Sequence, residues 1–369
     1  MIELQSLKKL FGFYKGGKQE TGLIIVVLLL CVFLTAASDT IFVAGEYVNN
    51  FFRIDNIIPN VATPMSWMAI MAIGATFVII SGGIDISVGS IFGISALGTV
   101  AVLQNLPENC SAWIVLPIAF LVPISIGMFF GFINGALVVS LKMHPFIVTL
   151  GSMSILRGIA LVTVTEKSLP AFGKTLPAAF TNNFISHQMN YGPLAWAKLQ
   201  PVPMIIMIVF VLLAAFYLTS TKWGREIYAV GGNEEAAKFS GLNVGLIKIR
   251  VFVLSGFAAG LAGMISAGYY GSANTATGEG YELTVIAAAV VGGASLLGGR
   301  GTALGAVLGA LIIKLIENGI DILKEVNFGL FSIYISKEYS KIIIGLAIIA
   351  AVAIDRFSSS FKKKSKVKL

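Results

Sequence analysis

The feature that most constrains this chain is a series of apolar runs, because an α-helix needs about 20 consecutive apolar residues to cross a bilayer. Charged residues make up only 12% of the 369 residues, whereas soluble domains carry about 25%. The longer runs are 22–37, 61–80, 86–104, 113–140, 146–164, 202–219 and 251–270, and the shorter ones are 283–297, 302–316 and 342–354. The sequence therefore predicts an all-α integral membrane protein, a polytopic helix bundle with about ten transmembrane helices.

The basic residues indicate which side of the membrane each segment faces. More than half of the 26 Lys and Arg residues lie at 1–21, 220–250 and 356–369. Cytoplasmic segments carry such an excess, so we expect both ends of the chain inside, as basic tails that flank a single transmembrane domain at 22–355. The same clustering accounts for the net charge of +8, which therefore gives no support to nucleic-acid binding.

No residue pattern in the sequence predicts catalysis or metal binding. The two histidines, His144 and His187, are far apart and have no carboxylate neighbours at the spacing of metal ligands. FGKT at 172–175 resembles the end of a phosphate-binding loop, but Ser168 stands where the first glycine is needed and Pro170 lies inside the stretch. We therefore expect no catalytic residue, no metal ligand and no cofactor in this chain.

A helix breaker and a carboxylate interrupt the apolar sequence at ISGGIDISVGS, residues 80–90. Backbone polar groups inside hydrocarbon must be bonded within the protein, so this break faces protein, a cavity or the interfacial region. Asp85 has two compatible interpretations. It caps the start of a helix at 86–104, where a carboxylate accepts backbone N–H bonds, or it belongs to a transport path, as ionisable residues inside membranes often do.

A second stretch, VGGASLLGGRG at 291–301, resembles the first. Aligning the two places the glycine pair at 82–83 opposite the pair at 292–293, and Asp85 opposite Ser295. Paired interruptions of this kind point to a transport site between two structural repeats. The sequence therefore favours broken helices within the bundle.

The polar loop at 220–250 contains a short capped helix. Asn233 is a good N-cap, Glu234 and Glu235 suit the positive end of the helix dipole, and Gly241 can end the helix. Two turns are about 10 Å long and are marginal in water, so such a helix needs a docking surface. It is either an amphipathic connector lying against the bilayer or a coupling helix presented to a cytoplasmic partner.

Five blocks of the sequence, taken in order, resemble the permease subunits of ribose-type ATP-binding-cassette importers over nearly the whole chain. The blocks are ISGGIDISVGS at 80–90, GFINGALVVSLKMHPFIVTLGSM at 131–153, GREIYAVGGNEEAAKFSGLNV at 224–244, GEGYELTVIAAAVVGGASLLGGRGTALGAVLGALI at 278–312 and AIIAAVAID at 347–355. Several separated blocks in the correct order make the resemblance specific. The segment at 165–201 is long for the family.

The resemblance implies an importer in a bacterial inner membrane, in which two permease subunits, most simply a homodimer, form the pathway. Cytoplasmic ATPases would bind the ATP and Mg²⁺, and an extracytoplasmic sugar-binding protein would deliver the solute. Family substrates are mostly monosaccharides, with nucleosides or a furanosyl signalling molecule in some relatives. The ATPases would dock on the loop helix, through Gly231, Gly232, Asn233, Glu234, Glu235, Ala236, Ala237 and Gly241.

The substrate path is expected to depend on polar side chains, because an uncharged sugar needs groups that bond hydroxyls. The candidates are Asp85, Asn134, Thr149, Asn274 and Ser295. The main interpretation is therefore a monosaccharide permease that is moved by a separate ATPase. The alternative is an ion- or proton-coupled secondary carrier, for which Asp85 is the one candidate coupling carboxylate.

Overall fold

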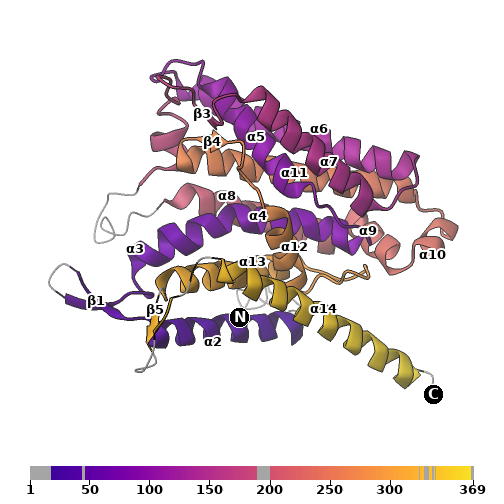
Figure 1. Ribbon diagram of the computed structural model, residues 1–369. Helices are drawn as coiled ribbons and strands as arrows, with labels where there is room; N and C mark the ends of the chain where they lie inside the picture. The colour runs from indigo at the N-terminus through magenta and orange to yellow at the C-terminus, as the bar shows by residue number, and fades with distance from the viewer. Residues whose placement is uncertain are drawn as a thin grey trace, which may run out of the picture.

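The computed structural model describes residues 18–43, 46–188, 200–323, 325–327, 332–334, 336 and 338–366, and most of them are helical (Figure 1). The helices are α2 (Lys18–Ala37), α3 (Ile54–Asn56), α4 (Thr63–Ile80), α5 (Val88–Leu103), α6 (Ala112–Ser140), α7 (Pro145–Thr163), α8 (Pro201–Ser220), α9 (Lys222–Gly232), α10 (Glu234–Phe239), α11 (Val244–Tyr270), α12 (Tyr281–Val291), α13 (Ala303–Ile322) and α14 (Tyr339–Lys366). Two π-helical turns, η1 (Ile57–Ala62) and η2 (Thr181–Ile185), complete the helical part. Most of the predicted N-terminal tail, at 1–17, and the last residues of the C-terminal tail, at 367–369, lie outside the described residues.

Each of the ten predicted apolar runs coincides with a helix, which confirms the all-α membrane fold. Among the described residues, seven helices are long and apolar enough to cross a bilayer, and Val88–Leu103, Tyr281–Val291 and Tyr339–Ala350 are shorter apolar helices. Several helix bounds differ from the predicted runs. α11 begins earlier, at Val244, and α14 continues to Lys366. α12 stops at Val291 because glycines follow it, and α13 continues past residue 316 to Ile322.

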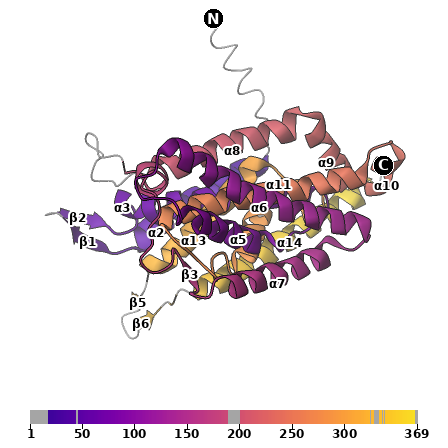
Figure 2. The same ribbon diagram turned by 90° about the horizontal axis from the view of Figure 1, so that it is seen from above.

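Helices α4 and α11 form the centre of the bundle. α11 packs against α6, α4 and α5, and Figure 2 shows α8 and α7 on opposite sides of the α6–α11 pair. The most apolar stretch of α4 is buried throughout, whereas only 6% of the corresponding stretch of α2 is buried. Outward side chains of α2 such as Leu29 and Val32 therefore face lipid, as hydrophobic residues on the rim of a membrane bundle do.

Small residues allow α6 and α11 to approach each other closely. A Cβ built on Gly127 would stand 2.1 Å from the carbonyl oxygen of Gly256, and one on Gly131 would stand 2.4 Å from that of Phe252. Such contacts let backbones pack directly, which is a main source of helix association in membranes, where lipid competes with apolar side chains. This glycine face therefore serves packing.

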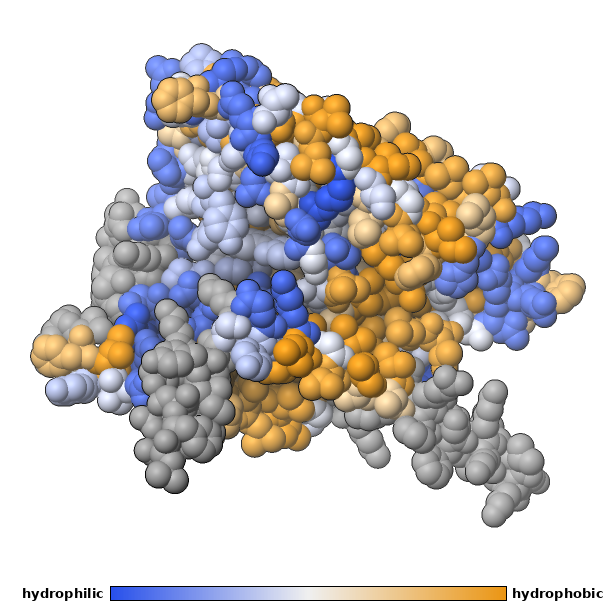
Figure 3. Space-filling view, viewed as in Figure 1, coloured by the Kyte–Doolittle hydropathy of each residue, from blue (hydrophilic) through white to orange (hydrophobic). Residues whose placement is uncertain are grey.

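Polar segments lie at the two ends of the bundle. At one end are three two-stranded antiparallel sheets, β1 (Thr40–Val43) with β2 (Glu46–Asn49), β3 (Ser168–Leu169) with β4 (Ala273–Asn274), and β5 (Glu325–Asn327) with β6 (Ser332–Tyr334). Helices α9 and α10 lie at the other end, on the right of Figure 1. Hydrophilic residues gather at both ends, and apolar surface covers much of the face between them (Figure 3). The bilayer fits between these ends.

Candidate functional site

The two glycine interruptions end their helices with the same backbone geometry. Gly82 follows α4 with a φ of 85°, and Gly293 follows α12 with a φ of 97°. At both places the glycine N–H donates to the carbonyl three residues back, and the next N–H donates to the carbonyl five residues back, over 2.8–3.0 Å. This is the Schellman ending, and it favours glycine because a Cβ is strained at positive φ.

This geometry corrects the alignment of the two stretches. The sequence pairs Gly82 with Gly292, but the equivalent backbone position is Gly293. The prediction is wrong by one residue because glycines were matched by identity, whereas the helix ending is set by backbone angles. In the corrected register Asp85 lies opposite Leu296 and no longer opposite Ser295.

Both interruptions meet at the end of α9. The N–H of Gly299, in the second interruption, donates to the carbonyl oxygen of Ile80, where the first begins, at 2.8 Å. A Cβ built on Gly231 would stand 1.6 Å from that same oxygen and 2.7 Å from the Gly299 nitrogen. The Tyr228 hydroxyl donates to the carbonyl of Gly301 at 2.6 Å. Three backbone segments, distant in sequence, are therefore held in direct contact.

The first interruption also borders a cavity of about 390 Å³, as its predicted exclusion from lipid requires. Gly82 and Gly83 line it on one side, and the turn from α6 to α7 lines it on another. Glu234 and Lys248, which form an ion pair at 2.7 Å, complete its wall. The cavity therefore lies between the broken end of α4 and the short helix α10.

Helix α10 is the capped helix that the sequence predicts. The Asn233 side chain accepts a hydrogen bond from the Ala236 N–H at 2.9 Å, and both glutamates stand in the first turn. Gly241 ends the helix with a φ of 82°. Both capping predictions are confirmed.

The predicted docking residues divide into an exposed and an internal set. Gly232, Asn233, Glu234, Glu235, Ala236 and Gly241 are exposed. Ala237 is 5% exposed and packs inward, and Gly231 is half-buried at the junction, so neither offers a free surface. Phe239 is 91% exposed and was missed by the sequence analysis, although an aromatic in a polar two-turn helix was a usable signal.

Asp85 is buried, with 1% of its surface exposed. One carboxylate oxygen accepts hydrogen bonds from the N–H and the hydroxyl of Ser87, at 2.9 and 2.6 Å, and the other accepts from the hydroxyl of Ser255 in α11 at 2.9 Å. α5 begins only at Val88, after an N-cap at Ser87, so the interpretation of Asp85 as the N-cap is wrong. The carboxylate instead ties the segment before α5 to α11.

Asn134 and Thr149 belong to the same polar cluster. Asn134 of α6 donates to the Ser87 hydroxyl at 2.8 Å and accepts from the Ser152 hydroxyl of α7. Thr149 of α7 accepts from the Ile86 N–H at 3.2 Å. The start of α5 is thus hydrogen-bonded to α6, α7 and α11.

The other two predicted path residues lie elsewhere. Asn274 is exposed in β4, where its side chain accepts from the Ala276 N–H at 3.0 Å and forms a turn. Ser295 lies in the second interruption, where its hydroxyl accepts from the Leu297 N–H at 3.3 Å. The five candidates therefore form one cluster of three and two separate positions.

Helices α5 and α12 both begin inside the bundle. Asp85 bonds to Ser255, which stands near the middle of the 27-residue α11. A Cβ built on Gly89, in the first turn of α5, would stand 2.7 Å from the Gly278 oxygen and 2.4 Å from Glu282 Oε2, so α12 begins beside it. α12 has 11 residues, about 16 Å, roughly half of the ~30 Å hydrocarbon core. Two helix N-termini, each with partial positive charge, thus lie together at mid-depth.

A charged pair lies beside these two helix starts. Arg157 of α7 donates one Nη to the carbonyl of Thr277 at 2.7 Å. Among the described residues, its other Nη and the Oε2 of Glu282 are buried atoms without a hydrogen-bond partner. Unpartnered buried atoms of opposite charge are costly, and inside a membrane they mark a functional position.

A second charged pair lies on α13. Lys314 is 7% exposed, bonds to Glu317 at 2.6 Å and lies 5.9 Å from the ring centre of Tyr281. The Tyr281 ring also stacks on Phe92 at 5.5 Å. The five predicted path residues include none of these side chains, although Arg157 and Lys314 stand as charges inside the apolar runs 146–164 and 302–316.

The chain is similar to known transport proteins along most of its length. Residues 57–352 match the family described as branched-chain amino acid transport system / permease component. The ribose import permease protein RbsC of Haemophilus influenzae is 38% identical over 317 residues, 85% of this chain and 88% of that protein. The D-allose transport system permease protein AlsC of Escherichia coli is 34% identical over 96% of this chain and 96% of that protein. The galactose/methyl galactoside import permease protein MglC of Escherichia coli is 32% identical over 94% of this chain and 96% of that protein.

No solved structure matches the chain. The family match and the relatives agree with the resemblance that the sequence blocks carry, and the apolar helices agree with a multi-pass membrane protein. Relatives of this kind are transport subunits and not enzymes. The chain belongs to the family of ribose-type permease subunits of ATP-binding-cassette importers.

Proposed function

We propose that this chain carries a monosaccharide across a bacterial inner membrane as the permease subunit of an ATP-driven importer. Relatives named for ribose, allose and galactose transport support a monosaccharide substrate. The observation that carries the mechanism is the junction where Gly231 contacts Ile80 and Gly299. A movement of α9 would reach both interrupted segments at once, because backbone atoms touch there without side chains between them.

The exposed face of α10 is the proposed docking surface for a cytoplasmic ATPase, which would hold the ATP and Mg²⁺. Glu234, Glu235 and the 91% exposed ring of Phe239 lie on it. Exposed aromatics commonly anchor protein interfaces. The inward packing of Ala237 would hold α10 in place against α11. The basic residues of this loop support a cytoplasmic position for α9 and α10, and with it cytoplasmic chain termini.

Arg157, Glu282 and Tyr281 are the proposed sugar contacts. A sugar hydroxyl both donates and accepts, so the free guanidinium N–H and the free carboxylate oxygen could bond neighbouring hydroxyls, and the tyrosine ring offers an apolar face. Asp85 and Asn134 already have their bonds within the cluster, so their proposed role is to hold the start of α5.

A second copy of the chain is proposed to close the pathway. Ile155 and Leu283, on the two helices that carry the sugar contacts, are 62% and 61% exposed, so one chain leaves this side open. An extracytoplasmic sugar-binding protein would deliver the solute at the opposite end, where the two-stranded sheets lie.

The docking surface is tested with Gly232→Trp. A Cβ at Gly232 meets no atom within 4 Å, so the chain should fold normally. We expect the ATPase to be lost on co-purification and ATP-driven uptake of ribose, allose and galactose into proteoliposomes to stop. Gly22→Trp on α2, also in open space, is the matched control and should retain both. Normal assembly and uptake by Gly232→Trp would show that docking lies elsewhere.

The sugar contacts are tested in the assembled transporter with Glu282→Gln. The ATPase should still bind, while uptake at low sugar falls at least about tenfold, the effect of one lost charge-assisted hydrogen bond. Glu279→Gln is the control, because this neighbouring carboxylate is exposed. The same vesicles separate the alternatives. Uptake driven by an ion gradient without ATP would indicate a secondary carrier. Uptake of nucleosides in preference to ribose, allose and galactose would show that the substrate is a nucleoside and not a monosaccharide.

A further inference from the structure

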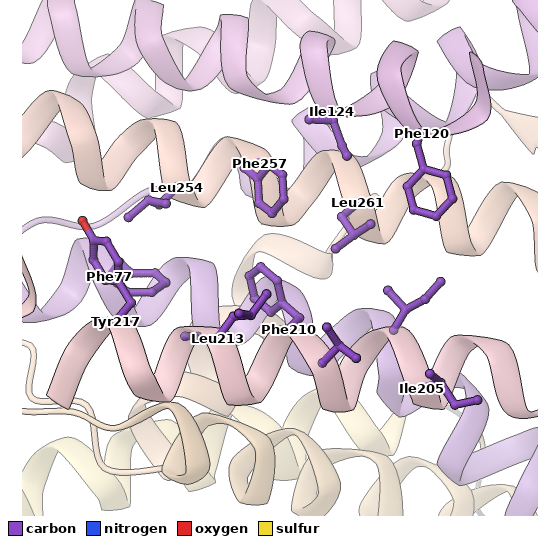
Figure 4. Close-up of a pocket in the computed structure, with 13 residues that line it drawn as sticks. Phe77, Phe120, Ile124, Ile205, Phe210, Leu213, Tyr217, Leu254, Phe257 and Leu261 are labelled. Carbon is purple, nitrogen blue, oxygen red and sulfur yellow. The ribbon is translucent and has the colours of Figure 1, made fainter. Parts of the chain in front are cut away.

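An apolar groove runs along the membrane-facing side of α8. This α8 groove encloses about 430 Å³ between α4, α6, α8 and α11 (Figure 4). Phe77, Phe120, Val209, Leu213, Tyr217 and Leu254 are among its 13 lining residues. Among the lining residues that the structure describes, Tyr217 alone carries a polar side-chain group, its hydroxyl.

The groove is elongated along α8. Its lining on this helix extends from Ile205 to Tyr217, about 18 Å along the axis, somewhat more than half of the ~30 Å hydrocarbon core, which leaves room for most of one acyl chain. Tyr217 is three residues from the end of α8, on the side where α9 begins. The rim is open to the outside, since Ile205 and Leu213 are 55% and 63% exposed. The groove therefore opens sideways into hydrocarbon.

Basic residues lie at the α9 end of the groove. The Trp223 ring is 6.0 Å from the Tyr217 ring, and the Arg250 guanidinium lies 5.5 Å from the centre of Trp223. Lys222 and Arg225 are exposed on the same short helix. The acidic group among them is Glu226, with 14% of its side chain exposed, so the accessible charge at this end is positive. Such a cluster attracts an anionic headgroup, and a tryptophan suits the interface.

We propose that the α8 groove binds one acyl chain of an anionic phospholipid whose headgroup lies against the basic residues of α9. The apolar lining, the elongated shape, the lateral opening and the positive end together match that ligand and no water-soluble one. None of the proposed sugar contacts lines the groove, so it is a separate site. The proposed orientation places the headgroup on the cytoplasmic side, and the site itself does not depend on the transport assignment.

Native mass spectrometry of the protein extracted in mild detergent tests the site. Leu213→Trp should fill the groove and lower the fraction of protein that retains phospholipid at least fivefold. Leu212→Trp is the matched control, because Leu212 is 64% exposed, stands next to Leu213 and does not line the groove. It should retain lipid like the wild type. Equal retention by both variants would overturn the proposal.

The headgroup is tested in nanodiscs that contain equal phosphatidylglycerol and phosphatidylethanolamine. The wild type should retain the anionic lipid at least threefold over the neutral one, and the double variant Lys222→Gln, Arg225→Gln should lose that preference while binding lipid. Absence of any preference in the wild type contradicts the anionic assignment. A change of oligomeric mass in Leu213→Trp without loss of lipid would show that a second copy covers the groove.

Discussion

The backbone junction at Gly231 gives the sharpest test of how the two interrupted helices are held. In Gly231→Ala the added methyl group would stand 1.6 Å from the Ile80 oxygen and 2.7 Å from the Gly299 nitrogen. Both are backbone atoms and cannot rotate away, so the three segments must separate. The hydrogen bond between Gly299 and Ile80, 2.8 Å long, would lengthen or break.

The size of the effect follows from these contacts. Overpacking costs about 1–3 kcal/mol and a lost hydrogen bond about 1 kcal/mol, so we expect a loss of about 2–4 kcal/mol in the free energy of unfolding. At about 2 °C per kcal/mol, the thermal midpoint should fall by about 4–8 °C. Tryptophan fluorescence during heating of the purified protein in detergent would measure it.

The neighbouring glycine is the control for this experiment. Gly232 precedes the same cap, but its added Cβ meets no atom within 4 Å, so Gly232→Ala should change the free energy of unfolding by less than about 0.5 kcal/mol. The reasoning is refuted if Gly231→Ala unfolds at the wild-type temperature, or if the two variants lose the same stability. The first result would mean that the junction separates at little cost, and the second that the loss does not come from the backbone contacts of Gly231, since alanine favours a helix more than glycine does.

Two further predictions concern the groups around the interruptions. Asp85→Ala removes the acceptor of three hydrogen bonds from Ser87 and Ser255. At about 1 kcal/mol for each bond, the free energy of unfolding should fall by about 3 kcal/mol, which is measured as a lower thermal midpoint. A midpoint unchanged from the wild type would mean that the cluster does not hold α5. Burial, with a smaller effect from the Glu20 carboxylate, raises the pKa of Tyr228 to about 12. The unfolded pKa is about 10, so the stability from the protonated hydroxyl is complete below pH ~10 and is lost as the pH rises to ~12. Tyr228→Phe should lose about 1 kcal/mol at neutral pH with its bond to Gly301, and its midpoint should fall less steeply above pH ~10 than that of the wild type.

Local signals in the sequence predicted local structure well. The cap at Asn233, the acidic first turn and the stop at Gly241 depend on bonds within a few residues, so the sequence alone was sufficient to place α10. The ten apolar runs likewise predicted ten helices, because the requirement to bond every backbone group within hydrocarbon leaves few other folds.

The features that the sequence did not predict depend on contacts between residues far apart in the chain. Asp85 stands at a position typical of a cap, but its carboxylate accepts a hydrogen bond from Ser255, 170 residues further along the chain, and α5 begins only at Val88. The pairing of Arg157 with the start of α12 depends on how α7 packs beside α5, which no spacing in the sequence encodes. The register of the second interruption depends on backbone angles that the letters GG do not specify.

The two interruptions connect the exposed end of the molecule with its middle. At one end both contact α9, through Ile80 and Gly299, beside the exposed helix α10. At the other, the segment after α4 leads to the start of α5, and α12 begins at Tyr281, with Glu282 of its first turn against Gly89 of α5. Direct backbone contacts have no flexible side chains to absorb a displacement, and packed interfaces shift between discrete arrangements instead of deforming continuously. A partner that moved α9 would therefore change the distance between the starts of α5 and α12, where Arg157 and Glu282 keep unpartnered atoms, without any contact of its own with that site.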